Sequence, residues 1–332
     1  IPFSQASPSQ PIHIGIVGTG FIAQGLISNL RHSRRLNPSA VLSRRSPDSL
    51  PKIAADIAVG TADELIEKCD LVVECSGDVH HAASVVEAAM EAGKPVVTMA
   101  TEFHVTIGSY FADKGMITEA EGDQPGCLAA LHEEALEMGF EPLVYGNIKG
   151  FLNHHPTEED MRFWSEKQGI SVPQVTSFTD GTKIQMEQAF IGNGMKTDIL
   201  CRGLRGYSDL DLDEGGAKLA REAEELGKPV SDYLLNGTLP PGVFITGRNK
   251  EAEPSVLRYL KLGDGPFYTL IRPYHLCHLE IPRTIRRVLS GGPPLLNNTT
   301  EPTLTVCAVA KTDLKAGETI GRAIGGQLLM AL

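Results

Sequence analysis

The segment Asp180–Lys183, with the sequence D-G-T-K, contains two ionisable side chains that could move a proton. Glu187 follows Lys183 by one helical turn, and Asp180 stands where it could cap the helix that carries both. A desolvated lysine beside a carboxylate can pass a proton to or from a substrate hydroxyl while a hydride is transferred. A surface ion pair explains the same spacing equally well, so both interpretations stay open.

Lys149 and Glu102 are two further candidates, and each follows a short apolar run. Lys149 comes after a strand predicted near residues 142–145 and precedes the polar run Asn153–His155. Its ammonium could receive a substrate carboxylate or phosphate. Glu102 follows a strand predicted at residues 95–99, where it could orient the substrate or hold a metal ion.

A glycine turn near the start of the chain matches the pattern G-x-G-x-x-[GA]. Gly18 permits a tight turn, Gly20 lets the backbone approach a pyrophosphate, and the small Ala23 allows close helix packing. Phe21 and Ile22 open the helix, whose N-terminus favours anionic phosphates. Because the turn lies between a predicted strand and a predicted helix, we prefer a dinucleotide-binding motif to a plain glycine turn.

The residues after the second predicted strand, Ser43-Arg44-Arg45, bear on the choice of cofactor. NAD enzymes generally place a carboxylate here for the ribose 2′-hydroxyl, whereas an arginine accommodates the 2′-phosphate of NADP. This stretch contains no carboxylate, and two guanidiniums can contact a phosphate in bidentate fashion. The sequence therefore favours NADP(H), with a solvated basic loop as the alternative.

The loop Cys75-Ser76-Gly77 follows the fourth predicted strand and should pass the nicotinamide half of the cofactor. Farther along, Glu121 and Asp123 belong to a cluster of carboxylates just before a helix predicted at residues 126–138. Such dense oxygen ligands could hold a divalent metal, or they could cap the helix and complement its dipole. We favour the cap.

The elements that must position these residues change in character along the chain. From residue 11 to about residue 100, short apolar strands alternate with amphipathic helices, which predicts βαβ units and a doubly wound parallel sheet. Beyond Gly122 the pattern becomes α+β, with strands predicted at residues 243–246, 256–262 and 267–271 and a last one beginning in 304–310. We therefore expect an α/β Rossmann domain at 11–124, a catalytic and dimerisation domain at 125–290, and a small β segment at 291–332.

Composition narrows the classes of partner. The 332 residues carry a formal net charge of −11, which repels nucleic acids and anionic membranes, and no apolar run approaches the length of a bilayer span. The six cysteines are scattered without a C-x-x-C pair, which indicates reduced thiols and a cytoplasmic location. The chain begins at Ile1, so a removed targeting segment stays an alternative. We expect a small-molecule substrate and a homo-oligomer.

Several of these motifs together resemble the homoserine dehydrogenase-like oxidoreductases that carry a C-terminal SAF domain. The motifs are the Gly18 fingerprint, Cys75–Gly77, Gly122–Pro125, Asp180–Lys183 and Arg272–Cys277. One branch of that family is similar to 1-deoxy-D-xylulose 5-phosphate reductoisomerase, an enzyme of isoprenoid synthesis. The resemblance implies NADP-dependent hydride transfer, with Lys183 and Glu102 at family positions. Residues 305–320 look like the opening of an SAF domain, which would be truncated, disordered or degenerate here.

Departures from the family pattern leave the substrate open. Homoserine dehydrogenases typically have A-N-K after the fifth strand, whereas Met99-Ala100-Thr101 stands here, and His104 replaces an aspartate of the reductoisomerase-like branch. A dinucleotide-binding sensor without turnover is therefore the second hypothesis. The leading one is hydride transfer between NADPH and a small polar carbonyl or hydroxyl compound in a cleft between two domains. Lys183 and Asp180 would handle the proton.

Overall fold

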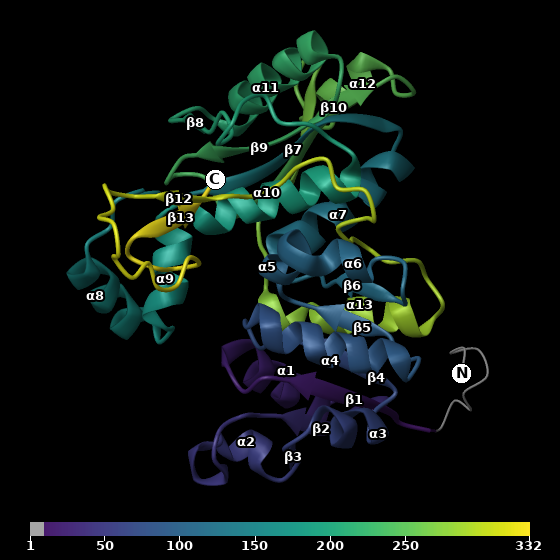
Figure 1. The fold of residues 1–332 in the computed structure, drawn as a ribbon. Helices are drawn as coiled ribbons and strands as arrows, with labels where there is room; N and C mark the ends of the chain where they lie inside the picture. Colours follow the sequence, from purple (N-terminus) through teal and green to yellow (C-terminus); the bar gives the residue numbers. More distant parts are fainter. Residues whose placement is uncertain (1–9) are drawn as a thin grey trace. The chain divides into compact units, whose positions relative to one another are not determined.

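The structure is a computed structural model that describes residues 10–332 (Figure 1). The chain forms two compact units, and neither is one continuous stretch of sequence. The first unit contains the described residues up to Cys127 together with His275–Pro302. The second contains Leu128–Tyr274 and Thr303–Leu332.

The first unit is built on a six-stranded parallel sheet with the order β3-β2-β1-β4-β5-β6. This is the strand order of the dinucleotide-binding doubly wound fold, and it confirms the predicted class. The strands are β1 (Ile12–Val17), β2 (Leu36–Leu42), β3 (Ala58–Val59), β4 (Leu71–Glu74), β5 (Val96–Thr98) and β6 (Ile117–Glu119). Their apolar side chains supply both faces of the sheet, because helices cover each face.

Two apolar layers hold the first unit together. Side chains of α1 and α13, such as Leu26 and Ile285, pack on one face of the sheet against Ile14 and Ile16. Side chains of α3 and α4 pack on the other face. The helical segments are α1 (Phe21–Arg31), α2 (Lys52–Ala55), α3 (Ala62–Glu67), α4 (Val79–Glu91), α5 (Thr101–Phe103), α6 (Ser109–Phe111) and α13 (Ile281–Leu289). Short turns of other helix types lie at Pro47–Ser49, His104–Gly108 and Cys277–Leu279.

The late return of the chain to the first unit includes one close backbone contact. Gly122 has a φ of +111°, and a Cβ there would lie 2.1 Å from the carbonyl oxygen of Cys277. The Cys277 N–H donates to the Gly122 carbonyl at 3.1 Å. Only glycine fits this position without strain. Two motifs that lie far apart in the sequence are thus brought together.

The second unit has a mixed five-stranded sheet with the order β11-β10-β7-β9-β8. Strand β9 pairs in parallel with β7 and β8, whereas β10 is antiparallel to β7 and β11. The strands are β7 (Phe140–Lys149), β8 (Tyr207–Ser208), β9 (Val230–Leu235), β10 (Gly242–Asn249) and β11 (Tyr268–Arg272). The helices are α8 (Glu158–Gln168), α9 (Val172–Thr179), α10 (Thr182–Met195), α11 (Leu212–Leu226) and α12 (Pro254–Tyr259), and α7 (Gln124–Glu137) begins in the first unit.

One predicted strand is wrong. Residues 256–262 contain the end of helix α12 and the turn that follows it. Pro254 occupies the first helical turn, where its fixed φ favours the helix and its missing N–H costs nothing. Leu257 is the helix's one buried residue, so the apolar letters of this stretch do not mark a buried strand.

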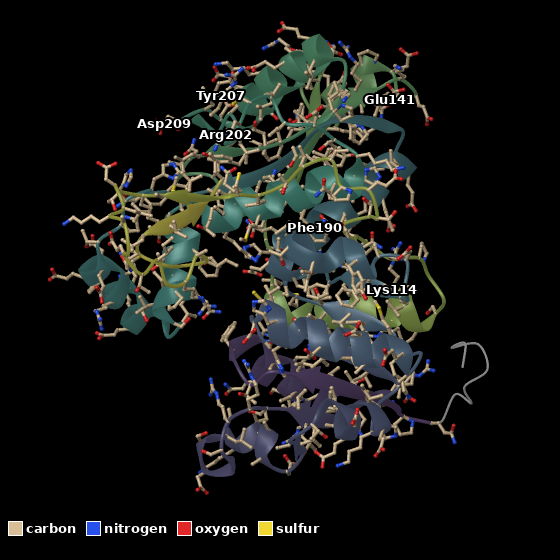
Figure 2. All side chains as sticks on the ribbon, viewed as in Figure 1. Lys114, Glu141, Phe190, Arg202, Tyr207 and Asp209 are labelled. Carbon is tan, nitrogen blue, oxygen red and sulfur yellow. The ribbon has the colours of Figure 1, made fainter. Side chains whose placement is uncertain are left out.

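Helix α10 is buried from Thr182 to Asn193, and Phe190, labelled in Figure 2, is fully buried on it. The C-terminal residues lie against this helix, as the yellow strands in Figure 1 show. Strands β12 (Ala308–Ala310) and β13 (Leu329–Ala331) pair antiparallel. The Asn193 side chain bonds the backbone of Leu304, and the Ala331 N–H donates to Thr182 Oγ1 at 3.1 Å. No helix within residues 10–332 is long and apolar enough to cross a membrane.

Candidate functional site

The glycine turn has the geometry that a dinucleotide needs. Gly18 has a φ of +105°, and a Cβ there would lie 3.0 Å from the Cys75 carbonyl oxygen, so the turn packs tightly on the β4 loop. A Cβ on Gly20 would meet nothing within 4 Å. Gly20 also begins α1 without a side-chain cap, and no acidic residue stands in the first turn. Open space beside uncapped N–H groups fits the pyrophosphate of a dinucleotide.

The positions of Phe21, Ile22 and Ala23 follow from this turn. Ala23 is fully buried, which permits the close packing expected of the motif's small residue. Phe21 is 62% exposed and Ile22 is partly buried. The first helical hydrogen bond runs from the Gln24 N–H to the Gly20 carbonyl. The N–H groups of the three preceding residues therefore remain at the helix terminus.

Arg44 lies just after β2, and its side chain contacts the carboxylate of a residue that is distant in the sequence. Its Nη2 atom is 2.7 Å from Asp78 Oδ2, in a pair whose side chains are 62% and 36% exposed. Asp78 caps α4 by accepting the His81 N–H, and this bond, followed by Arg44, lowers the pKa of Asp78. The exposed Arg45 donates its N–H to Ser43 Oγ. The fold thus brings an acidic residue from the β4 loop to the end of β2.

The Cys75–Gly77 loop is shaped by hydrogen bonds to its neighbours. Cys75 Sγ donates to the Val17 carbonyl at 3.3 Å, and burial raises the pKa of this thiol, so it stays protonated and is no nucleophile. The Ser76 N–H donates to Glu74 Oε1 at 2.8 Å. Gly77 has a φ of +69° with nothing near its missing Cβ. The loop leaves room beside it for a ligand.

A buried polar row crosses the ends of three neighbouring strands, and sequence reasoning missed it. Glu74, Thr98 and Glu119 are the last residues of β4, β5 and β6, pair in register, and are at most 1% exposed. Thr98 Oγ1 donates to Glu119 Oε2 at 2.7 Å. His104 Nε2 lies 3.3 Å from that same carboxylate oxygen, and burial lowers the pKa of His104 to about 3, so the imidazole is neutral.

In this row, Glu74 directly precedes the Cys75–Gly77 loop, which is predicted to pass the nicotinamide. Burial raises the pKa of its carboxyl to about 7, and the charge of Glu102 adds to the rise. Its Oε2 atom has no hydrogen-bond partner among the described residues. Glu102 itself lies in α5, partly exposed, directly after β5. The candidate Glu102 therefore belongs to the first unit, at the carboxyl edge of the sheet.

Glu121 and Asp123, for which metal binding was the alternative to a helix cap, are engaged with protein groups. Glu121 Oε2 lies 2.9 Å from Arg283 Nη1. Asp123 accepts the Thr101 hydroxyl and the Gln124 N–H, both at 3.1 Å, at the start of α7. Within residues 10–332, no group of three or more His, Cys, Asp or Glu side chains is arranged to bind a metal ion. The geometry here is that of a helix start.

In the second unit, Glu187 is held from two sides. Lys149 Nζ lies 3.0 Å and Asn147 Nδ2 lies 2.9 Å from the same oxygen, Glu187 Oε2. Glu187 is 1% exposed and the Lys149 side chain is 17% exposed. Lys183, one turn earlier on α10, is 9% exposed. Lys149 therefore pairs with Glu187. Because Lys183 and Glu187 are both buried, the surface ion pair that their spacing alone allowed is excluded.

Asp180 is fully buried at the turn before α10. Its Oδ1 atom accepts the Thr182 N–H at 2.8 Å, so Asp180 binds the first N–H group of α10, although Gly181 is the N-cap residue of that helix. Its Oδ2 atom lies 2.7 Å from Lys311 Nζ, in a pair with exposures of 0% and 4%. His154 Nδ1 lies 2.9 Å from the Asp180 carbonyl oxygen, which can only accept, so this nitrogen carries the proton. Lys311 was not identified from the sequence.

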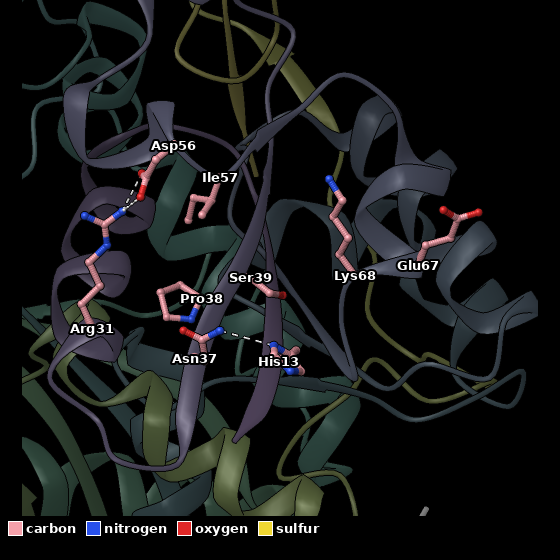
Figure 3. Close-up of a pocket in the computed structure, with 9 residues that line it drawn as sticks. All are labelled: His13, Arg31, Asn37, Pro38, Ser39, Asp56, Ile57, Glu67 and Lys68. Carbon is pink, nitrogen blue, oxygen red and sulfur yellow. Dashed lines mark hydrogen bonds and ion pairs between the residues drawn. The ribbon is translucent and has the colours of Figure 1, made fainter. Parts of the chain in front are cut away.

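A separate hollow of about 610 Å³ lies near the amino ends of strands β1 and β2 in the first unit (Figure 3). Its lining includes His13 and Asn37, which stand near the amino ends of β1 and β2. Arg31 and Asp56 form an ion pair at 2.7 Å on its rim. Doubly wound sheets bind nucleotides at their carboxyl edge, so this hollow is not part of the cofactor site.

Comparisons with known families match two separate stretches of the chain. Residues 18–105 match the family described as homoserine dehydrogenase, NAD binding domain. Residues 122–281 match the family described as oxidoreductase DRL, catalytic domain. Neither match reaches residues 303–332, so the resemblance to an SAF module stays a prediction.

Solved structures resemble this chain at low sequence identity, and the first of the two below has a TM-score above 0.5. A homoserine dehydrogenase from Thiobacillus denitrificans is 16% identical with a TM-score of 0.55, covering 85% of this chain and 74% of that one. A probable dehydrogenase from Thermotoga maritima is 16% identical with a TM-score of 0.48, covering 86% and 91%. No curated protein matches the sequence. With the glycine turn and the two family matches in place, the chain is an NAD(P)-dependent oxidoreductase.

Proposed function

We propose that this protein transfers a hydride between NADP(H) and a small polar carbonyl or hydroxyl compound. The observation that carries the proposal is the polar start of helix α10. Asp180, Lys183 and Glu187 are all at most 9% exposed there, and they lie within residues 122–281, which match an oxidoreductase catalytic domain. Asp, Glu and Lys are rarely fully buried unless they are paired, and a proton must be transferred when a hydride is transferred to a carbonyl.

The preference for NADP(H) over NAD(H) is supported by the end of β2. Arg44 and Arg45 are both exposed, and Ser43 adds a hydroxyl beside them. A 2′-phosphate would compete with Asp78 for Arg44 and form a charge-assisted, bidentate contact. Because the Arg44–Asp78 pair is largely exposed, its own attraction is weak and a dianionic phosphate can displace it.

The side chains would divide the work as follows. When bound, the nicotinamide donates or accepts the hydride. Lys183 would hold the proton that the substrate oxygen gains or loses, and Asp180 would keep the start of α10 in place for it. Lys149, which is partly exposed, would share its ammonium between Glu187 and a substrate carboxylate or phosphate. Glu102 would orient the substrate.

The substrates to be tested follow from this division. We include hydroxy acids, amino aldehydes and sugar phosphates, because each carries a polar group for Lys149 beside a reducible or oxidisable carbon. A reaction like that of homoserine dehydrogenase or of 1-deoxy-D-xylulose 5-phosphate reductoisomerase falls within this range.

We also propose that the protein forms a homo-oligomer. Light scattering of the purified protein would measure its oligomeric state.

The deciding experiment follows the absorbance of reduced nicotinamide with this panel, for the wild type and for K183A. We expect K183A to bind NADPH normally and to lose at least about 100-fold in kcat, because general acid–base groups contribute roughly that much. K250A is the matched control, since Lys250 is an exposed lysine of the same unit, paired with Glu141. If K183A turns over at the wild-type rate, Lys183 does not handle the proton.

A further inference from the structure

The C-terminal segment, residues 303–332, supplies a buried cation to the turn before α10. Lys311 follows β12 directly, and its Nζ atom lies 2.7 Å from Asp180 Oδ2. The same ammonium donates a hydrogen bond to the Gly326 carbonyl at 2.8 Å. The Asp180–Lys311 contact does not meet hydrogen-bond geometry at Oδ2, so it is an ion pair held mainly by charge.

We propose that Lys311 is a positioning residue of this oxidoreductase, which acts through Asp180 to fix the start of helix α10. The inference rests on the proposed function, because it gives the C-terminal segment a part in the chemistry assigned to Lys183. It assigns to residues 303–332 a role that neither family match covers.

The cost of a buried charge explains why a cation is needed here. Asp180 is 0% exposed, and a carboxylate removed from water is strongly penalised unless a cation and hydrogen bonds compensate it. The Thr182 N–H satisfies Oδ1, whereas Lys311 is the cation beside Oδ2. The imidazole of His154 bonds the backbone carbonyl of Asp180, not its carboxylate. Removing the Lys311 charge therefore leaves this carboxylate uncompensated.

The segment that carries Lys311 contacts the same unit near both of its ends. Asn193 Oδ1 accepts the Leu304 N–H at 2.8 Å, and Ala331 donates to Thr182 Oγ1. Gly325 passes so close to α9 that a Cβ there would lie 2.0 Å from the Pro173 carbonyl oxygen. These contacts place the ammonium before any ligand arrives. A pre-placed partner holds geometry without reorganisation during the reaction, which is how supporting residues help catalysis.

The geometry of α10 connects this pair to the proposed proton carrier. Asp180 accepts the N–H of Thr182, the first residue of the helix, and Lys183 is the next residue. A shift of the turn at Asp180 therefore moves the backbone of Lys183 directly. Small misplacements of a reacting group lower kcat strongly, while substrate affinity changes less.

The test uses K311M, K311R, D180N and the double variant D180N/K311M in the full chain. For K311M we expect about a tenfold or greater loss in kcat, with KM and the dissociation constant for NADPH within about threefold of wild type. K311R keeps the charge and should recover much of kcat. Because Lys311 acts through Asp180, the double variant should lose no more kcat than D180N alone. K315M is the control, since Lys315 is an exposed lysine of the same segment.

Unfolding by urea provides a readout that does not depend on turnover. K311M should unfold at a lower urea concentration than wild type, and D180N/K311M should regain part of that loss, because no lone carboxylate remains buried. Additive losses in stability and kcat would overturn the proposal, as would a K311M protein with wild-type kcat. If the wild type turns over none of the substrates, the proposed function fails for them. The unfolding cycle then still decides whether Lys311 holds Asp180.

Discussion

Each unit places an ion pair at or beside its candidate functional residues, and the two pairs differ in burial. In the first unit, Arg44 and Asp78 are 62% and 36% exposed, at the edge where the cofactor's ribose is expected. In the second unit, Asp180 and Lys311 are 0% and 4% exposed. An exposed pair is weak and exchanges readily with a ligand, whereas breaking a buried pair leaves an unpaired charge. The first pair can therefore act as an adjustable contact, and the second as a fixed support.

Removing Lys149 should have the largest effect on the free energy of unfolding. The Lys149–Glu187 pair is a second buried ion pair, so it tests whether breaking such a pair is costly. K149M leaves Glu187 buried without its cation, and we expect the free energy of unfolding to fall by about 3 kcal/mol. Urea unfolding measures it. K228M, which removes an exposed partner of Asp198, should change stability by less than about 0.5 kcal/mol. Equal losses in the two variants would remove the distinction between buried and exposed pairs.

The pH dependence of the free energy of unfolding tests the effect of burial on a charge of the first unit, the Glu74 carboxylate. Burial raises the pKa of Glu74 from 4.5 to about 7. Its contribution to stability is fully present below pH 4.5 and is lost as the pH rises through about 7, because the charged form is penalised in the folded state. The loss is on the order of 3 kcal/mol.

E74Q has no carboxyl to ionise, so its stability should fall less than that of wild type over this range. Asp232, whose pKa burial raises to about 6, contributes a loss of the same sign in both proteins. The difference between the two urea-unfolding series therefore isolates Glu74. Parallel pH curves for wild type and E74Q would show that Glu74 does not titrate in this window.

The exposed pair should show the smallest effects on stability and a selective effect on the cofactor. R44Q should weaken NADP(H) by about tenfold, roughly 1.4 kcal/mol, and leave NAD(H) nearly unchanged. D78N keeps the cap of α4, because asparagine caps helices as well as aspartate, and it releases Arg44. It should tighten NADP(H) by a few fold. Fluorescence titration measures both, and a D78N protein with weaker NADP(H) binding would show that Asp78 does not compete for Arg44.

Local patterns predicted the parallel sheet well and the buried contacts poorly. The alternation of strands and helices predicted the parallel sheet, because βαβ units leave a periodic signal in the sequence. The prediction of a strand at residues 256–262 failed, because apolar letters alone did not distinguish a short exposed helix begun by Pro254 from a buried strand. The roles of Lys183, Asp180, Lys149 and Glu102 in catalysis stay predictions.

The sequence by itself determined the Rossmann fold, the glycine turn and the basic end of β2, because each depends on residues that are neighbours along the chain. Only the tertiary structure decided which charges meet. It brought Asp78 to Arg44, Lys149 to Glu187 and Lys311 to Asp180. Such pairs depend on how strands align and on where the chain returns to a unit. The spacing of neighbouring residues in the sequence does not predict either. Burial then set their strength, because the same two charges attract weakly in water and strongly inside the protein.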